Sequence, residues 1–465
     1  AEVIPLSGLS PDELVALGAE RALALDPAEL VVIQQHFAEL GREPTDVELE
    51  TLAQTWSEHC AHKTFRAEIV TDDGEQRPSL LDMLRDVTRT IDAPFVRSAF
   101  VGNAGIVAFE AASGRAGRGG EVTLAVKAET HNHPSAIEPF GGANTGVGGV
   151  IRDVLGIGHR PVAVTDVLCF GPPDTPLEAL PAGTLHPLRI REGVIDGVAD
   201  YGNKIGLPTV AGAILYDPGY ATNPLVFAGC VGQATGWEPD RGPHPGDRVV
   251  VLGGRTGRDG IRGATFSSLT MDATTGEVAG ASVQIGEPII EKQLIDVLVG
   301  AEHLYSAITD CGAGGLSSAI GEMAEGVGAD VELDHVPLKY PGLEPWEIWL
   351  SEAQERMVVA VPPEHLPGLR DRCAHYGVEM ADLGEFTGDG QLVVRSGGTP
   401  VLDLSTKFLH DGRPRRRMTA TMPRPPRGGE GVRAVADPAA TLLALLGHRN
   451  IASKAGVIHR YDHEI

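Results

Sequence analysis

Residues 127–153 read KAETHNHPSAIEPFGGANTGVGGVIRD and combine a lysine, carboxylates and two histidines with closely spaced glycines. An apolar alternation over residues 122–126 leads into Lys127, as expected of a half-buried strand. An apolar run that is compatible with a helix begins near Val150. A strand, a glycine loop and a helix start together predict a phosphate-binding arrangement, because backbone N–H groups and the helix dipole converge on an anion there.

The same stretch carries the side chains that a nucleotide site needs. Glu129 and Asp153 are expected to hold Mg²⁺, which takes one or two carboxylates and shares the phosphate oxygens. The stretch has neither the GxxxxGK[ST] pattern nor a Rossmann fingerprint. The glycines alone would be explained equally well by a tight structural turn. Together with Lys127, His131 and His133, they favour a nucleotide site.

Composition limits the class of protein. A chain of 465 residues with 42% hydrophobic and 22% charged residues is expected to form two or three globular domains. The net charge of −25 argues against binding to nucleic acid or to an anionic membrane surface. Five scattered cysteines without CxxC spacing fit a reducing compartment and no zinc site. With no apolar run of transmembrane length and no signal-peptide segment, the expected location is cytoplasmic.

The chain divides into five expected segments. Ser10, Asp26 and Thr45 each begin a capping-box pattern, and the helix after Thr45 is expected to end in the sequence WSEHC at 56–60. Proline- and glycine-rich residues 236–247 separate two mixed units. The segments are a helical region 1–60, a first unit 61–238, a second unit 239–411, a linker 412–432 rich in Arg, Pro and Gly, and a remainder 433–465.

Both units are expected to belong to the α+β (mixed α/β) class. In the first unit, a hairpin is expected from two neighbouring strands, and the remaining elements follow the glycine loop; the expected strands are 106–111, 121–129, 162–169 and 225–231, and the expected helices are 150–155 and 188–205. The last 33 residues hold one short apolar helix at 441–446, which cannot bury its apolar face alone. They are expected to dock on the preceding units or to begin a further domain.

Long motifs in a fixed order give the chain a family resemblance. WSEHC at 56–60, the stretch 127–153 and SEAQERM at 351–357 resemble the synthetase subunit of phosphoribosylformylglycinamidine synthase. GRDGIRGATFSS at 257–268, VQIGEP at 283–288 and TDCGAGGLSSA at 309–319 agree with it. The resemblance extends from about Glu29 to the end of the chain.

The resemblance implies a fold and an activity. The fold is that of the aminoimidazole ribonucleotide synthetase-like superfamily, with an A domain that supplies a dimer-forming mixed sheet (61–238) and a packed B domain (239–411). Residues 433–465 would start a second A domain, so that the chain would be part of a longer synthetase. The implied enzyme is an ATP-dependent C–N ligase of purine biosynthesis. It converts formylglycinamide ribonucleotide to formylglycinamidine ribonucleotide through an iminophosphate that ammonia attacks.

The resemblance also implies roles for particular residues. His131 would be the proton acceptor and His59 a second active-site histidine, while His62 and Lys127 would contact ATP. Mg²⁺ would be held by Glu129, Asp153 and Asp310. The substrate would be held by Thr130, His131, Asn132, His133, Arg152, Gln284, Glu352, Ala353 and Gln354, with an arginine fork suited to its phosphate.

Simpler interpretations of the same residues stay open. Asp310 alone would be a helix cap or turn residue, and His59 a surface or capping histidine. His133 is as well explained as a partner that orients His131. Glu352 and Gln354 would also fit solvent-facing strand positions. Ala353 stands where relatives commonly have serine, which removes a hydroxyl from the implied substrate contact.

The resemblance implies partners as well. By this resemblance, a separate glutaminase and a small accessory subunit are expected. The GxCxG setting of a glutaminase nucleophile does not occur in this sequence. A homodimer would be a further form of assembly. The alternative function is a catalytically incomplete nucleotide-binding or assembly half that needs a partner chain. A superfamily relative acting on aminoimidazole ribonucleotide, thiamine phosphate or selenophosphate is disfavoured by the SEHC and HNHPSAIEPFGG motifs.

Overall fold

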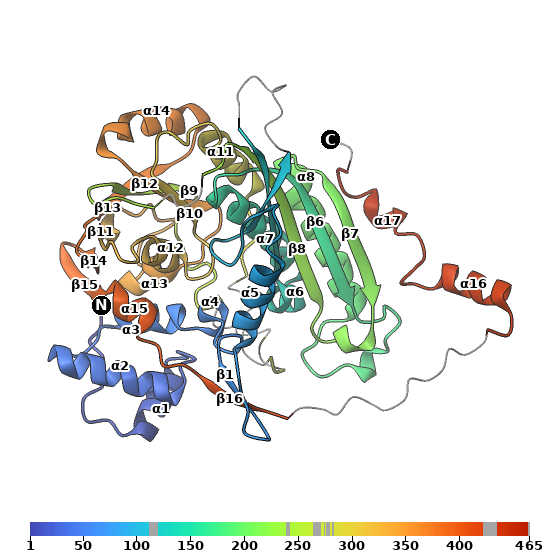
Figure 1. Ribbon diagram of the computed structural model, residues 1–465, viewed down its shortest axis with the longest axis horizontal. Helices are drawn as coiled ribbons and strands as arrows, with labels where there is room; N and C mark the ends of the chain where they lie inside the picture. Colours follow the sequence, from blue (N-terminus) through green and yellow to red (C-terminus); the bar gives the residue numbers. More distant parts are fainter. Residues whose placement is uncertain are drawn as a thin grey trace.

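The computed structural model describes residues 1–110, 120–238, 242–263, 271–273, 275, 280, 283–421 and 435–463 (Figure 1). Their strands form a six-stranded, a seven-stranded and a three-stranded sheet, with helices packed on the two larger ones. The expected mixed α/β class is confirmed.

The N-terminal region is helical, as expected, but its third helix is shorter than the sequence indicated. Ser10, Asp26 and Thr45 each form a capping box. The prediction that the third helix runs into WSEHC is wrong: it ends at Thr55, and Ser57 caps a separate turn by accepting a hydrogen bond from the Cys60 N–H. The helices are α1 (Pro11–Glu20), α2 (Pro27–Leu40), α3 (Asp46–Thr55) and α4 (Glu58–Ala61).

The six-stranded sheet lies in the first unit. Every neighbouring pair is antiparallel except β6 and β7. The antiparallel pairing of β4 with β5 confirms the expected hairpin, whose connection at 111–119 lies outside the described residues. In spatial order the strands are β3 (Val96–Ser98), β4 (Gly105–Glu110), β5 (Val122–Thr130), β8 (Leu225–Thr235), β6 (Arg160–Phe170) and β7 (Thr209–Tyr216), and α5 (Leu80–Ile91) precedes them in the chain.

The glycine-rich stretch after β5 is helical, which corrects the expectation of a glycine loop before a helix near Val150. It forms α6 (Asn132–Ile137) and α7 (Pro139–Gly156). The glycines allow close packing: a Cβ on Gly146 would lie 2.8 Å from the His131 Cβ, and one on Gly148 would lie 2.5 Å from the Tyr201 hydroxyl. Tyr201 belongs to α8 (Pro187–Ile205), which packs along α7. The glycines therefore bring helices and the His131 turn together rather than cradle an anion.

The seven-stranded sheet lies in the second unit. β11 and β14 are parallel, and the other neighbours are antiparallel. In spatial order the strands are β10 (Ala307–Asp310), β12 (Arg356–Val361), β9 (Arg248–Gly253), β13 (Met380–Phe386), β11 (Ala329–Glu332), β14 (Gln391–Ser396) and β15 (Thr399–Ser405). The helices of this unit are α11 (Pro288–Leu298), α12 (Gly315–Met323), α13 (Pro345–Leu350), α14 (Leu366–Tyr376) and α15 (Thr406–Asp411).

Two hydrophobic cores meet at this second sheet. Along β9, Val250 and Leu252 join the core that includes α7, α8, α11 and α14, whereas Val249 and Val251 join the core with α12 and the N-terminal helices. The alternation follows from the two-residue period of a strand. Each residue of β12 is buried, as expected of a strand covered on both faces. The two units and the N-terminal helices are thus joined by continuous packing.

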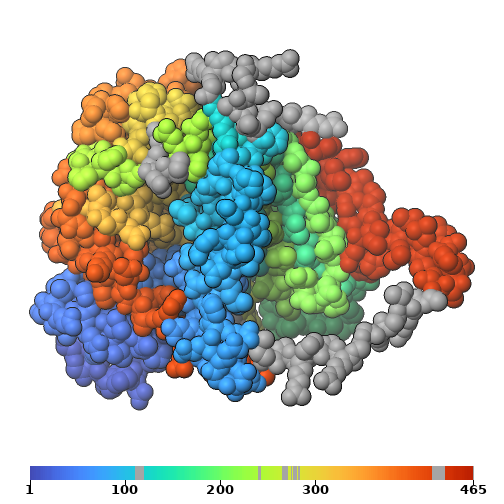
Figure 2. All heavy atoms as spheres, in the orientation of Figure 1, coloured from blue at the N-terminus to red at the C-terminus, as the bar shows by residue number. Residues whose placement is uncertain are grey.

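The last part of the chain returns to earlier elements. Residues 417–420 were expected in a linker but form β16 (Arg417–Ala420), which pairs in parallel with β1 (Glu68–Thr71); β1 also pairs with β2 (Gln76–Arg77). After the undescribed residues 422–434 come α16 (Pro438–Gly447) and α17 (Ala455–Ile458), which lie beyond β7 and form the projection coloured red in Figure 2. Asn450 exchanges hydrogen bonds with the Tyr216 backbone, so this segment docks on the first unit. Within the described residues, none of the helices has both the length and the apolar character needed to cross a membrane.

Candidate active site

The C-terminal end of β5 places a lysine among carboxylates. Lys127 and Glu129 are two residues apart and so share one face of the strand, which faces Asp153 on α7. The Lys127 Nζ lies 2.9 Å from Glu129 Oε2 and 3.1 Å from Asp153 Oδ2. Burial disfavours its charge, but the Asp153 and Glu129 carboxylates outweigh this effect and raise the pKa of Lys127. Lys127 is therefore a fixed cation.

A third carboxylate approaches from the second unit. Asp310 ends β10, is buried, and accepts a hydrogen bond of 2.8 Å from the Asn103 amide. Burial, together with the Asp310 charge, raises the pKa of Asp153 well above its usual range, and burial raises the pKa of Asp310. Burial therefore disfavours the charged form of these carboxylates, and a bound cation would stabilise it.

The carboxylate oxygens are the donors that Mg²⁺ prefers. Within the described residues, no group of three or more His, Cys, Asp or Glu side chains is already arranged to hold a metal ion. The Lys127 ammonium lies between Glu129 and Asp153, so that it would have to move toward a bound phosphate before both could share a metal ion. The residues fit Mg²⁺ by donor chemistry, with that rearrangement.

Two histidines lie at the same strand end. The His131 Nδ1 lies 2.5 Å from the Gly142 carbonyl oxygen, and its backbone N–H donates to the Val226 carbonyl. The His59 Nε2, on α4, lies 3.7 Å from Glu129 Oε1. Burial lowers the pKa of both rings. Both histidines are therefore held in the neutral form near pH 7, in which a ring nitrogen can accept a proton.

The neighbouring residues of the motif differ in what their side chains do. His62 has a left-handed backbone (φ 49°, ψ 47°) at the end of α4, and burial lowers the pKa of its ring. The Asn132 amide oxygen accepts a hydrogen bond of 2.8 Å from the Val226 N–H, which fixes the turn to β8. Thr130 is exposed at the end of β5, and His133 lies in α6. The structure brings these residues together around the C-terminal end of β5.

Arg152 does not present an open fork. It is 1% exposed, and its Nη1 lies 2.8 Å from Glu291 Oε2, while its Nη2 donates to the Gln354 side-chain oxygen. The Gln354 N–H in turn donates to the Gln284 side-chain oxygen at 3.1 Å. Arg152 therefore supports the two glutamines expected to hold the substrate, and in this structure its guanidinium faces a carboxylate rather than a phosphate.

The remaining expected substrate residues lie in the same segment. The Glu352 Oε1 accepts a hydrogen bond of 3.0 Å from the Gly314 N–H, at the start of α12. Ala353 is fully buried, so its methyl group contributes packing rather than a polar contact. The simpler interpretation of Glu352 and Gln354 as strand positions facing solvent is wrong, because both precede β12 and contact other segments.

Several residues that support the site were not among the site residues expected from the sequence. The Tyr201 hydroxyl lies 2.5 Å from Glu291 Oε2 and 2.9 Å from Glu355 Oε1, and these side chains are buried around Arg152. Burial raises the pKa of Glu291 to about 7. Asn103 donates a hydrogen bond to Asp310, and Asn144 accepts one from the Gly286 N–H. These contacts could not be predicted because the residues are far apart in the sequence. Packing of α7, α8 and α11 brings Arg152, Tyr201 and Glu291 together.

Comparison with known proteins shows which proteins this chain is similar to. The descriptions "AIR synthase related protein, N-terminal domain" and "AIR synthase related protein, C-terminal domain" match residues 103–234 and 244–397, and "Formylglycinamide ribonucleotide amidotransferase linker domain" matches residues 14–63. The chain is 35% identical, over 97% of its length and 56% of the relative's, to "Phosphoribosylformylglycinamidine synthase subunit PurL" of Thermoplasma acidophilum. The chain thus matches both AIR synthase related domains and is similar to PurL over nearly its whole length.

Further PurL proteins are similar to this chain to a comparable degree. The Cutibacterium acnes PurL is 37% identical over 91% of this chain and 54% of the relative. Thermotoga maritima PurL complexed with FGAR has a TM-score of 0.66 and 34% identity, covering 87% of this chain and 59% of that one; the complex with ATP has a TM-score of 0.67 and 30% identity, covering 93% and 61%. The chain therefore spans less than two thirds of these PurL proteins.

Proposed function

We propose that this chain carries a site that binds ATP and formylglycinamide ribonucleotide and converts the ribonucleotide to its amidine, with ammonia as the nitrogen donor. The observation that carries the proposal is the Lys127, Glu129, Asp153 and Asp310 cluster beside two neutral histidines, in a chain related to PurL proteins solved with FGAR and with ATP. The cluster offers a cation for a phosphate and carboxylates for a metal ion.

The chemistry requires activation of an amide. An amide oxygen leaves poorly, so it first attacks the γ-phosphorus of ATP and ADP departs. Ammonia then adds to the resulting iminophosphate carbon, and the C–O bond breaks to release phosphate. Phosphoryl transfer depends mainly on positioning and on stabilising charge at the phosphate. Lys127 supplies that charge in the proposal, with His62 as a further contact to ATP.

Proton removal is assigned to the histidines. The amide nitrogen loses a proton as the imine forms, and ammonia loses one after it adds. His131 is the proposed acceptor, because burial lowers its pKa and the Gly142 carbonyl fixes its ring. Since Nδ1 faces that carbonyl, Nε2 is the nitrogen available to the substrate. His59 is proposed as the second active-site histidine, held near Glu129.

Mg²⁺ is proposed as the cofactor, held by Glu129, Asp153 and Asp310. When bound, it would neutralise charge on the ATP phosphates. The raised pKa values of Asp153 and Asp310 support this assignment, because burial disfavours their charged forms and a bound cation would stabilise them. Lys127 would then turn from the carboxylates to a phosphate oxygen.

The ribonucleotide is proposed to lie along the two glutamines and the His131 turn. The residues assigned to it are Thr130, His131, Asn132, His133, Gln284, Glu352, Ala353 and Gln354, with Arg152 supporting Gln354. This assignment replaces the expected phosphate fork at Arg152 with an indirect contact.

Assembly is part of the proposal. A glutaminase and a small accessory subunit are proposed as partners, and the Thermotoga maritima PurLQS structure is a related assembly. Val126 on β5 is 49% exposed and Val210 on β7 is 53% exposed, which leaves apolar surface on the first sheet for a second copy of the chain. The alternative is that the chain binds nucleotide but turns over only with a partner chain, because it spans less than two thirds of its relatives.

Phosphate release separates these functions. The purified chain is incubated with ATP, Mg²⁺ and ammonium, with and without formylglycinamide ribonucleotide, and its mass in solution is measured alongside. Release that requires the ribonucleotide supports the complete site. ATP binding without release supports the alternative. Absence of both ATP binding and release would refute the nucleotide site.

A further inference from the structure

The turn that carries His59 and His62 has little stability of its own. α4 has four residues, fewer than an isolated helix needs to form in water. His62 caps the C-terminal end of α4 in a left-handed backbone conformation, which residues other than glycine rarely adopt. The position of His59 opposite Glu129 must therefore be fixed by contacts from outside the turn.

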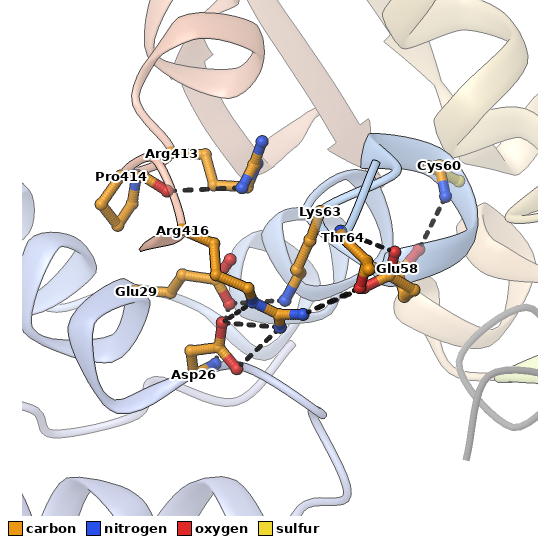
Figure 3. A network of polar contacts seen from close by, with 10 residues as sticks. Asp26, Glu29, Glu58, Cys60, Lys63, Thr64, Arg413, Pro414 and Arg416 are labelled. Carbon is orange, nitrogen blue, oxygen red and sulfur yellow. Dashed lines mark hydrogen bonds and ion pairs between the residues drawn. The ribbon is translucent and has the colours of Figure 1, made fainter. Parts of the chain in front are cut away.

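Those contacts converge on Glu58, the residue before His59 (Figure 3). One Glu58 oxygen accepts from the Thr64 N–H at 2.9 Å, and the other accepts from the Thr64 hydroxyl at 3.0 Å. These two bonds close the turn across its ends. The second oxygen also lies 3.1 Å from Nη1 of Arg416, which is 358 residues further along the chain.

Arg416 joins this turn to the N-terminal helices. Its Nη2 and Nε donate to the Asp26 carboxylate, which begins α2, at 2.9–3.2 Å. Beside it, Lys63 makes a 2.6 Å ion pair with Glu29, and both side chains are 2% exposed (Figure 3). The Arg416 carbonyl accepts from the Glu68 N–H, where β16 begins to pair with β1. The planar guanidinium thus bridges two carboxylates from separate elements, a geometry that lysine cannot reproduce.

We infer that Arg416 is a positioning residue of the active site: its guanidinium clamps the α4 turn onto α2 and thereby holds His59 and His62 at the end of β5. The inference rests on the proposed function for the roles of the two histidines. Its structural part, the fixed position of His59, stands on the contacts alone. The Arg416 side chain is 29% exposed. Arg416 lies between α15 and β16, directly before β16 begins.

The neighbouring Arg415 provides a matched control. It has the same charge and lies in the same segment, but it is 58% exposed and its nearest carboxylate oxygens are 3.5 Å and 3.9 Å away, on Asp82 and Glu68. Removal of Arg415 changes the net charge as much as removal of Arg416 does. It leaves the Glu58 and Asp26 contacts intact.

The experiment compares Arg416→Ala, Arg416→Lys and Arg415→Ala in the whole chain. The first readout is the hydrogen exchange of the Cys60 and Thr64 backbone N–H groups, followed by NMR. The Cys60 N–H donates to the Ser57 side chain within the turn, and the Thr64 N–H donates to Glu58. Release of the turn exposes both groups to water, so their exchange is expected to become faster in Arg416→Ala, to change less in Arg416→Lys and to stay unchanged in Arg415→Ala.

The second readout is the ATP dissociation constant with Mg²⁺. We expect it to rise about tenfold in Arg416→Ala, equivalent to about 1.4 kcal/mol, and to be unchanged in Arg415→Ala. If Arg416→Ala does not fold, Glu58→Gln tests the same contact from its other side, with faster exchange of the Cys60 N–H expected. The inference is overturned if the Cys60 N–H exchanges in Arg416→Ala or Glu58→Gln at the rate found in Arg415→Ala. Failure of the unaltered chain to bind ATP would refute the proposed function instead, while the exchange rates would still decide the clamp.

Discussion

Replacing Gly148 by alanine is expected to destabilise the protein, whereas the same change at the neighbouring Gly149 is expected to stabilise it. Both glycines lie inside α7. A Cβ added to Gly149 would have no atom within 4 Å, while one added to Gly148 would lie 2.5 Å from the Tyr201 hydroxyl oxygen and 2.6 Å from Cζ. The pair therefore separates helix propensity from packing in two adjacent positions.

The magnitudes follow from these contacts. Alanine in place of glycine stabilises a helix interior by about 0.5–1 kcal/mol, and this gain applies to both variants. At position 148 it is opposed by overpacking, which costs about 1–3 kcal/mol. Tyr201 is fully buried and bonded to Glu291 and Glu355, so moving it also weakens hydrogen bonds to charged groups, at about 1.5–3 kcal/mol for each bond lost. Gly148→Ala should therefore be less stable than Gly149→Ala by at least about 1–3 kcal/mol.

The assay is urea unfolding of the two variants and the unaltered chain, followed by far-UV circular dichroism and intrinsic fluorescence. The expected order of midpoints is Gly149→Ala, then the unaltered chain, then Gly148→Ala. A Gly148→Ala midpoint equal to that of Gly149→Ala would refute the packing role of the glycines. It would also reopen the interpretation of this stretch as a loop.

Three further predictions concern the site. His131→Ala should lose about 10²- to 10⁴-fold in turnover while ATP still binds, measured as ribonucleotide-dependent phosphate release; unchanged turnover would remove its role as proton acceptor. Burial lowers the pKa of His131 below the unfolded value of about 6.5, so folding stability should fall as the pH drops below about 6.5. Over the same pH range, the thermal midpoint of His131→Asn should fall less than that of the unaltered chain. Equal falls in the two proteins would contradict this prediction. Lys63→Met should cost about 3–5 kcal/mol of unfolding free energy, because it leaves the buried Glu29 carboxylate without its ion-pair partner. Adding Glu29→Leu should recover part of this loss, since that change also removes the hydrogen bond that Glu29 accepts from the Asp26 N–H. A single variant as stable as the unaltered chain would contradict the account.

Local patterns predicted much of the secondary structure. The capping boxes at Ser10, Asp26 and Thr45 started helices at the expected positions, because a cap depends on residues only three apart. The alternation before Lys127 likewise predicted β5. The helix over the glycine-rich stretch was not predicted. Glycine favours loops unless packing against a partner such as Tyr201 requires its small size.

Side-chain partners were less accessible to prediction. The lysine and its two carboxylates were found because Lys127, Glu129 and Asp153 lie in one short motif. Glu291 and Arg416 gave no signal, since each meets its partner only after distant segments pack together. The expected phosphate fork at Arg152 is absent from the arrangement found for the same reason: the burial of Glu291 beside it was not visible in the sequence.

The most direct test of the proposed chemistry follows the amide oxygen. Formylglycinamide ribonucleotide labelled with ¹⁸O at that oxygen is incubated with this chain, ATP, Mg²⁺ and ammonium, and the released phosphate is analysed by mass spectrometry. The account predicts one ¹⁸O in each phosphate molecule formed in a ribonucleotide-dependent manner, because the amide oxygen leaves on phosphorus. Ribonucleotide-dependent phosphate without the label would contradict it.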